Sequence, residues 1–192
     1  MDTRTPKPTN QLRTTHPQVP KEIKAHKVVI EVTITPTMLQ EAQERFNFGV
    51  LNGSITRGEG NLAGALGEVA SIHYLQSKGY RVEDTSTYDY DIIVNGHKVD
   101  VKTKRQRHAP LPHNRVTVSS WNTKQQCDFY FFATALYNHS YVYLNGYYQK
   151  EAFFREADFK HKGDGDPEGG NTSFTFTHDC YVLHNHQIHK FK

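Results

Sequence analysis

The feature of this sequence that most constrains its fold is an Asn-Gly pair at residues 95 and 96. The pair lies inside the segment YDYDIIVNGHKVDVKTK, residues 88–104, in which apolar and polar side chains alternate. A two-residue type I′ turn needs positive φ at both positions, which Asn and Gly adopt most readily, and it joins two antiparallel strands. The segment therefore predicts a β-hairpin with a defined register.

The register of this hairpin decides which side chains share a face. With a two-residue turn, Ile92 lies opposite Val99 and Asp91 lies opposite Asp100. Because side chains alternate between the faces of a strand, we expect Asp91, Asp100 and Lys102 on one face. Like charges opposed across a ladder are destabilising. Mg²⁺, which takes one or two carboxylates plus waters and phosphate oxygens, would offset that repulsion.

Lys102 follows Asp100 by two residues. An amine at that point can orient or deprotonate an attacking water, or stabilise negative charge on a phosphate. The competing interpretation is a solvated hairpin face on which Lys102 pairs with Asp89, its expected partner across the ladder. Asp89 can also orient Lys102 within a catalytic site.

A helix is expected over residues 59–78, upstream of the hairpin. Apolar residues recur there at helical spacing, and the same stretch is rich in small residues: Gly60, Ala63, Gly64, Gly67, Ala70 and Ser71. Small residues lower helix propensity, so their presence predicts close packing of this helix against a sheet. Glu68 lies beside the apolar stripe, where a solvated charge would be out of place.

The remaining pattern predicts an α/β fold with a central mixed sheet flanked by helices. Further helices are expected at 36–47 and 150–159, and strands at 27–35, 80–83, 128–136, 141–144 and 173–183. Residues 1–26 are rich in Thr, Pro, Lys and Arg, which predicts a flexible basic arm. The rest of the 192-residue chain, residues 27–192, is expected to form a single domain.

The hairpin motif resembles the PD-(D/E)xK nuclease superfamily, whose core hairpin holds Asp and then Asp or Glu, any residue, and Lys. Asp91 and the triplet Asp100-Val101-Lys102 match that pattern. Gly67-Glu68 looks like the helix glutamate that many members carry upstream, and the segment 127–131 looks like the apolar strand that follows the hairpin. The arrangement is also similar to small phage-encoded nucleases. Tyr90 stands where many members have proline.

The resemblance implies a restriction-endonuclease-like core and hydrolysis of DNA phosphodiester bonds by activated water with Mg²⁺ or Mn²⁺. It implies Glu68, Asp91 and Asp100 as metal ligands and Lys102 as the residue that assists the water. We expect an endonuclease rather than an exonuclease, and a homodimer, since a small domain commonly needs two copies to cut both strands. The alternative is a catalytically silent DNA-binding or interaction module on the same fold.

The overall charge permits nucleic-acid binding without requiring it, since the net charge is +3 and the pI about 8.7. The prediction of DNA binding therefore depends on the local clustering of basic residues. We expect a DNA-contacting set around the hairpin, where the alternative is a solvated loop: Lys98, Lys104, Arg105, Arg107 and Arg115. Trp121 and Asn122 beyond it are candidates for DNA contact, although a partly buried Trp is the more common case and is expected here.

Cysteine usage and hydropathy bear on the compartment. Cys127 and Cys180 are expected to be free thiols in a reducing compartment. No apolar run approaches the roughly 18 residues of a membrane helix, and the first residues lack the apolar core of a secretory signal. We therefore expect a cytoplasmic protein of a bacterial or phage-infected cell.

A histidine-rich segment near the end of the sequence, HDCYVLHNHQIHKFK, carries potential zinc ligands at residues 178, 180, 184, 186 and 189. Regular spacing along one strand spreads such ligands too far apart for a single tetrahedral ion. A zinc-stabilised structural protein is therefore a third, less favoured interpretation.

Overall fold

The computed structural model describes residues 29–47, 61–85, 87–166 and 173–191. The expected arm at residues 1–26 lies outside these ranges. The helices are α1 (Pro36–Asn47), α2 (Asn61–Ser77) and α3 (Lys150–Glu156), with a 3₁₀ helix η1 (Ser120–Lys124). The strands are β1 (Ile30–Thr33), β2 (Val82–Asp84), β3 (Ile92–Val94), β4 (His97–Gln106), β5 (Arg115–Ser119), β6 (Phe129–Leu136), β7 (Tyr141–Gln149), β8 (Asp158–Lys160) and β9 (Cys180–His184).

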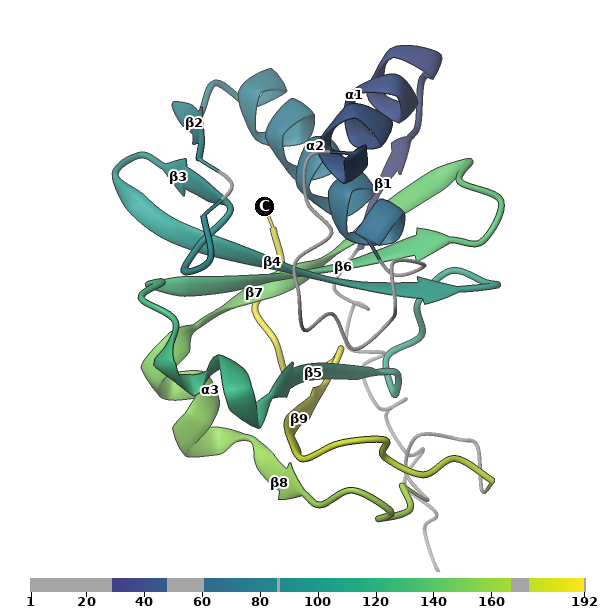
Figure 1. Cartoon of the computed structure of the whole chain (residues 1–192), viewed down its shortest axis with the longest axis vertical. Coiled ribbons are helices and arrows are strands. Elements are labelled where there is room, and N and C mark those ends of the chain that lie inside the picture. The colour runs from purple at the N-terminus through teal and green to yellow at the C-terminus, as the bar shows by residue number, and fades with distance from the viewer. Residues whose placement is uncertain (1–28, 48–60, 86, 167–172, 192) are drawn as a thin grey trace, which may run out of the picture.

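The strands form two sheets. The larger is six-stranded in the order β1-β7-β6-β4-β3-β2, and the smaller is three-stranded in the order β5-β9-β8. Only β4 and β6 run parallel, so the large sheet is mixed. Helices α1 and α2 cover one face of it, while α3 and the small sheet lie on the other (Figure 1). The expected α/β class with a central mixed sheet is confirmed. Within the described ranges no helix is long and apolar enough to cross a membrane.

The expected hairpin forms at the expected turn. Asn95 and Gly96 have φ of 49° and 88°, as a type I′ turn requires. The register pairs Ile92 with Val99, and Val94 with His97. The apolar face of the hairpin is buried in the core beneath α1 and α2, through Ile92, Val94, Val99 and Val101. The side chains at alternate positions of β4 therefore face the small sheet.

Helix α2 packs directly on β4, as its small residues predict. A Cβ atom added to Gly67 would lie 1.9 Å from Thr103 Oγ1, so no side chain fits between the helix and the strand at this point. The neighbouring turns bury Ala63, Leu66 and Ala70 in the same core. The contact at Gly67 brings the next residue, Glu68, close to β4.

Several expected boundaries are wrong. Helix α3 ends at Glu156 rather than Phe159, because residues 158–160 form β8 against β9. The strand expected at 173–183 is limited to β9, and β7 extends to Gln149. Strand β5, which the sequence does not predict, pairs with β9 more than 60 residues away. Local patterns carry no information on such long-range pairing.

The contact between α2 and β4 can be tested with two glycines of the same helix. Gly67→Ala should lower the free energy of unfolding by about 1 to 3 kcal/mol, because Thr103 must shift to admit the methyl group. Gly64→Ala is the matched control, since nothing lies within 4 Å of its added Cβ. It should raise the free energy of unfolding by up to about 1 kcal/mol through helix propensity. Urea denaturation measures both, and equal effects would contradict this packing.

Candidate functional site

Asp100 and Lys102 project from β4 toward the small sheet. Asp100 is 4% exposed, and its Oδ2 atom lies 2.5 Å from the Nζ atom of Lys102. Their neighbours on the parallel strand β6 are Tyr130 and Phe132, and the Lys102 ammonium lies 5.7 Å from the centroid of the Tyr130 ring. The expected sharing of a face by Asp100 and Lys102 is confirmed, and both groups lie in an apolar, aromatic setting.

Gln125, a residue that the sequence analysis did not single out, joins these two groups. Its Nε2 atom donates to Asp100 Oδ1 at 2.8 Å and to the Tyr88 carbonyl at 3.0 Å. Its Oε1 atom accepts from Lys102 Nζ at 3.3 Å and from Asn122 Nδ2 at 2.9 Å. Gln125 is buried and all its side-chain hydrogen-bonding atoms are used. No local pattern marks a single glutamine in a loop 25 residues from its partner.

Asp91 lies at the end of the β3–β4 ladder. The ladder stops at the pair Ile92–Val99, and the Asp91 N–H donates to the Val99 carbonyl at 3.0 Å. The Asp91 carboxylate accepts a hydrogen bond from the Val101 N–H at 2.6 Å. The expected direct opposition of Asp91 and Asp100 as a ladder pair is therefore wrong. At this point a side-chain carboxylate, rather than a backbone carbonyl, accepts the hydrogen bond from β4. Asp91 therefore lies at the edge of β4.

Glu68 reaches the same region from α2, on the other face of the large sheet. Its Oε2 atom lies 3.2 Å from Nη1 of Arg45 on α1, and Arg45 also pairs with Asp84 at the end of β2. The sequence analysis gave no role to Arg45 or Asp84. These residues lie 23 and 16 positions from Glu68, so only the tertiary fold brings them to it.

The three carboxyl groups act on one another electrostatically. Burial raises the pKa of Asp91 well above its ordinary value, and the charges of Asp100 and Glu68 raise it further. Burial also raises the pKa of Glu68 to about 7, against the lowering effect of Arg45 and with added repulsion from Asp100 and Asp84. Glu68, Asp91 and Asp100 therefore share one electrostatic environment where β3 begins.

The carboxylate groups of this cluster are of the type that binds a divalent cation, but they are not spaced closely enough to hold one together. Oxygen ligands of buried carboxylates suit Mg²⁺, although Asp100 Oδ2 is already paired with the Lys102 ammonium. In the part of the chain that the structure describes, however, no three His, Cys, Asp or Glu side chains lie close enough to hold one metal ion. Glu68 is directed to Arg45, and Asp91 to the Val101 N–H.

The competing interpretation required Asp89 to pair with Lys102, and it does not. Its Oδ1 atom accepts from the Gln126 N–H at 3.1 Å, while Lys102 is paired with Asp100. The ladder ends before Asp89, so the register that would place it opposite Lys102 does not extend that far.

The expected DNA-contacting residues divide into two groups. Lys98, Arg105 and Arg107 are exposed, as a phosphate-binding surface requires. Lys104 and Arg115 are instead half-buried and line a cavity between β4 and β5. Lys104 lies on the same face of β4 as Lys102, which the small sheet covers.

Trp121 in η1 is 77% exposed rather than partly buried, which corrects another expectation. It precedes Asn122, the residue that donates to Gln125. Tyr88, whose carbonyl accepts from Gln125, is 72% exposed. Two exposed aromatic side chains therefore belong to the segments that hydrogen-bond to Gln125.

Cys127 and Cys180 are free thiols, as expected. Among the described residues, the histidines and cysteine at 178–189 form no group that can hold a metal ion, although the rings of His184 and His186 stack with centroids 5.7 Å apart. Cys180 is buried in a small cluster with Phe176 and Val182.

No protein-family model and no curated protein matches this chain. The roles assigned to Asp91, Asp100 and Lys102 therefore depend on the geometry of the site and on the hairpin motif.

The raised pKa of Glu68 predicts a dependence of stability on pH. The folded chain keeps a proton on Glu68 up to about pH 7, whereas its ordinary pKa is 4.5. Folded protein binds more protons than unfolded protein between these values, so stability falls as the pH rises through this window. Glu68→Gln should flatten that slope and raise the free energy of unfolding at pH 8 by roughly 1 to 3 kcal/mol.

Chemical denaturation at intervals from pH 4.5 to 8 measures this effect. Glu44→Gln, at an exposed position on α1, is the matched control and should leave the slope unchanged. An unaltered slope in Glu68→Gln would contradict the burial of a carboxyl group whose desolvation outweighs its ion pair with Arg45.

Gln125→Leu tests the role of the buried amide. The change leaves Asp100 Oδ1 and the Tyr88 carbonyl without their donor, at a cost of about 1 to 3 kcal/mol for each unsatisfied group. Gln126→Leu, at the exposed next position, should change stability by less than about 0.5 kcal/mol. Thermal unfolding of both variants provides the comparison, and equal stabilities would argue against the network.

Proposed function

We propose that this chain is a metal-dependent DNA endonuclease of the PD-(D/E)xK type. The observation that carries the proposal is the group of mutually repelling carboxyl groups of Glu68, Asp91 and Asp100 at the start of β3, with Lys102 2.5 Å from Asp100. The antiparallel β3–β4 hairpin and the parallel β4–β6 pair support it, since they hold the motif on rigid strands.

Asp91 and Asp100 would hold the ion, Mg²⁺ or Mn²⁺, with Glu68 as a third carboxylate. A bound divalent cation supplies Lewis-acid polarisation of a phosphoryl oxygen and lowers the pKa of a coordinated water. Raised carboxyl pKa values support this assignment, because the cost of burying Asp91 and Glu68 as anions is relieved by a cation.

Lys102 carries the proton-handling role in this proposal. Its side chain is 22% exposed, so Lys102 is proposed to contact both Asp100 and an incoming phosphate. Gln125 accepts from Lys102 and donates to Asp100, and thereby fixes the positions of both groups. Gln125 is a positioning residue in this account.

Arg45 acts as the present counter-charge of Glu68. An Arg guanidinium and a divalent cation compete for the same carboxylate, so participation of Glu68 in metal binding requires Arg45 to remain with Asp84 alone. The ion pair of Arg45 and Asp84 gives the guanidinium a partner in that state.

Exposed residues near the hairpin suit a nucleic-acid substrate. Lys98, Arg105 and Arg107 supply positive charge for a phosphate backbone. Tyr88 and Trp121 present exposed aromatic side chains in the two segments that hydrogen-bond to Gln125, and unpaired bases can stack on such side chains.

A catalytically silent DNA-binding module is the second candidate. The pairing of Glu68 with Arg45 favours it, because the protein then neutralises its own carboxylate without a metal ion. The two candidates differ in whether Mg²⁺ binds at Asp100.

Cleavage of supercoiled, linear and branched DNA, with Mg²⁺ or with EDTA, tests the proposed function. The wild-type chain should nick or cut DNA only with the metal ion present. Asp100→Asn and Lys102→Met should each lower the cleavage rate by about a hundredfold or more, since they remove the ligand and the proton-handling group. Asp158→Asn, at an exposed position on β8, should cleave at the wild-type rate.

Thermal unfolding with and without Mg²⁺ separates the two candidates. Metal binding to the folded state alone should raise the melting temperature of the wild-type chain but not of Asp100→Asn. Cleavage that persists in EDTA, or that survives both active-site substitutions, would overturn the proposed mechanism. DNA binding without any effect of Mg²⁺ would favour the silent module.

A further inference from the structure

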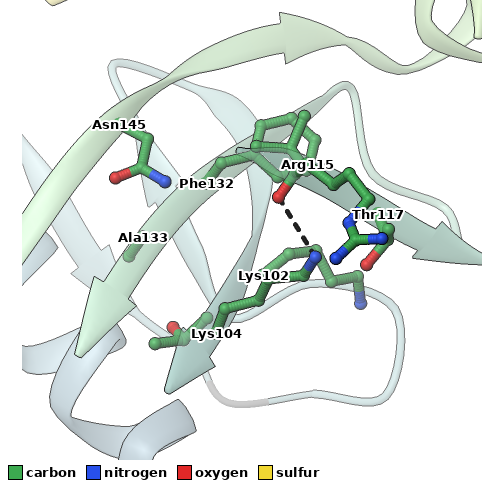
Figure 2. A pocket seen from close by; sticks show the side chains of 9 residues that line it. Lys102, Lys104, Arg115, Thr117, Phe132, Ala133 and Asn145 are labelled. Atoms are coloured by element: carbon green, nitrogen blue, oxygen red, sulfur yellow. Dashed lines mark hydrogen bonds between the residues drawn. The ribbon is translucent and has the colours of Figure 1, made fainter. Parts of the chain in front are cut away.

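A cavity of about 110 Å³ lies beside the candidate active site, between β4 and β5 (Figure 2). Its wall includes the cationic residues Lys102, Lys104 and Arg115, with Thr117, Asn145 and the Phe132 ring. The cavity exceeds the space that a single water needs. Lys102 lines the cavity and is also one of the proposed catalytic residues, so the cavity adjoins the candidate active site.

The cavity concentrates more positive charge than its carboxylates neutralise. Lys102 is paired with Asp100, and Arg115 with Asp166 at 2.9 Å. Lys104 Nζ donates to the Arg115 carbonyl at 3.1 Å, and no described carboxylate lies within ion-pair distance of it (Figure 2). One buried ammonium is therefore left without a counter-ion.

The electrostatics of Lys104 agree with this geometry. Burial, together with the nearby charge of Arg115, lowers its pKa to about 8, against the raising effects of Cys180 and Asp166. Unpaired buried cations are expensive, and ionisable groups with strongly shifted pKa values concentrate at functional sites.

Asn145 supplies a further group to the cavity. It lies where the β6–β7 register shifts, and it is 4% exposed. Its Nδ2 atom donates to Thr134 Oγ1 at 3.0 Å, while its Oδ1 atom is buried without a partner. A rotation of the amide by half a turn would let the Thr134 hydroxyl donate to Oδ1 instead, because a hydroxyl both donates and accepts. The NH₂ group would then be available as a donor.

We propose that this cavity is a binding site for a phosphate group. Donors from three strands, Lys104 on β4, Arg115 and Thr117 on β5 and Asn145 on β7, surround a small volume with a net positive charge. A tetrahedral oxyanion accepts hydrogen bonds in several directions and so matches donors that converge from different strands. Only the source of the phosphate, a nucleic-acid strand held at Asp100 and Lys102, depends on the proposed function.

The test is an NMR titration of Lys104 with inorganic phosphate in metal-free buffer. A bound anion favours the charged form, so phosphate should raise the pKa of Lys104 from about 8. Lys104→Met keeps the volume of the side chain and removes a buried charge, so it should fold and should bind phosphate at least about tenfold more weakly. Asn145→Asp, an isosteric change that adds a negative charge, should have the same effect. Lys78→Met, at an exposed position after α2, is the control and should bind as wild type.

Competition with short DNA duplexes distinguishes the sources of the phosphate. A duplex that competes only when 5′-phosphorylated would identify a terminal phosphate, and equal competition by both forms would identify an internal one. Competition by neither would identify free phosphate as the ligand. An unchanged Lys104 titration in phosphate, or equal phosphate binding by wild type and Lys104→Met, would overturn the proposal. The Lys104 titration and the phosphate-binding measurements require neither Mg²⁺ nor DNA cleavage, so they are independent of the nuclease test.

Discussion

The hydrogen bond from the Val101 N–H to the Asp91 carboxylate is the interaction on which the candidate site depends. It ends the β3–β4 ladder with a side chain, so that among the described residues no strand pairs with this edge of β4 beyond Val99. Groups from both faces of the large sheet can approach one another at that edge. Glu68 comes from α2 on one face and Asp100 from the other, with Asp91 between them.

The molecule offsets the burial of these charges with polar partners rather than with solvent. Asp100 has Lys102 and Gln125, and Glu68 has Arg45. Asp91 has a single backbone N–H, and its pKa is correspondingly raised well above the ordinary value. Buried polar networks are costly when incompletely satisfied, and such groups concentrate at functional sites. The incomplete satisfaction of Asp91 and Glu68 supports an exogenous cation as their partner.

The sequence predicts the parts of this arrangement that are local. The Asn95-Gly96 turn fixes the register of the hairpin, and that register places Asp100 and Lys102 on one face. The small residues of α2 predict its contact with β4. Contacts between distant segments are not encoded in any local period, which is why Arg45, Gln125 and the pairing of β5 with β9 were missed. Lys104 shows the same limit, because strand alternation places it with Lys102 but does not reveal that a second sheet covers that face.

The most direct test of the central claim is an NMR titration of the carboxyl carbons of Asp91 and Glu68, with and without Mg²⁺. A cation held by this cluster favours the ionised carboxylates, so Mg²⁺ should lower both pKa values, that of Glu68 from about 7. The same titration of exposed Glu44 should be unaffected. Identical titration curves for Asp91 and Glu68 with and without Mg²⁺ would contradict the account.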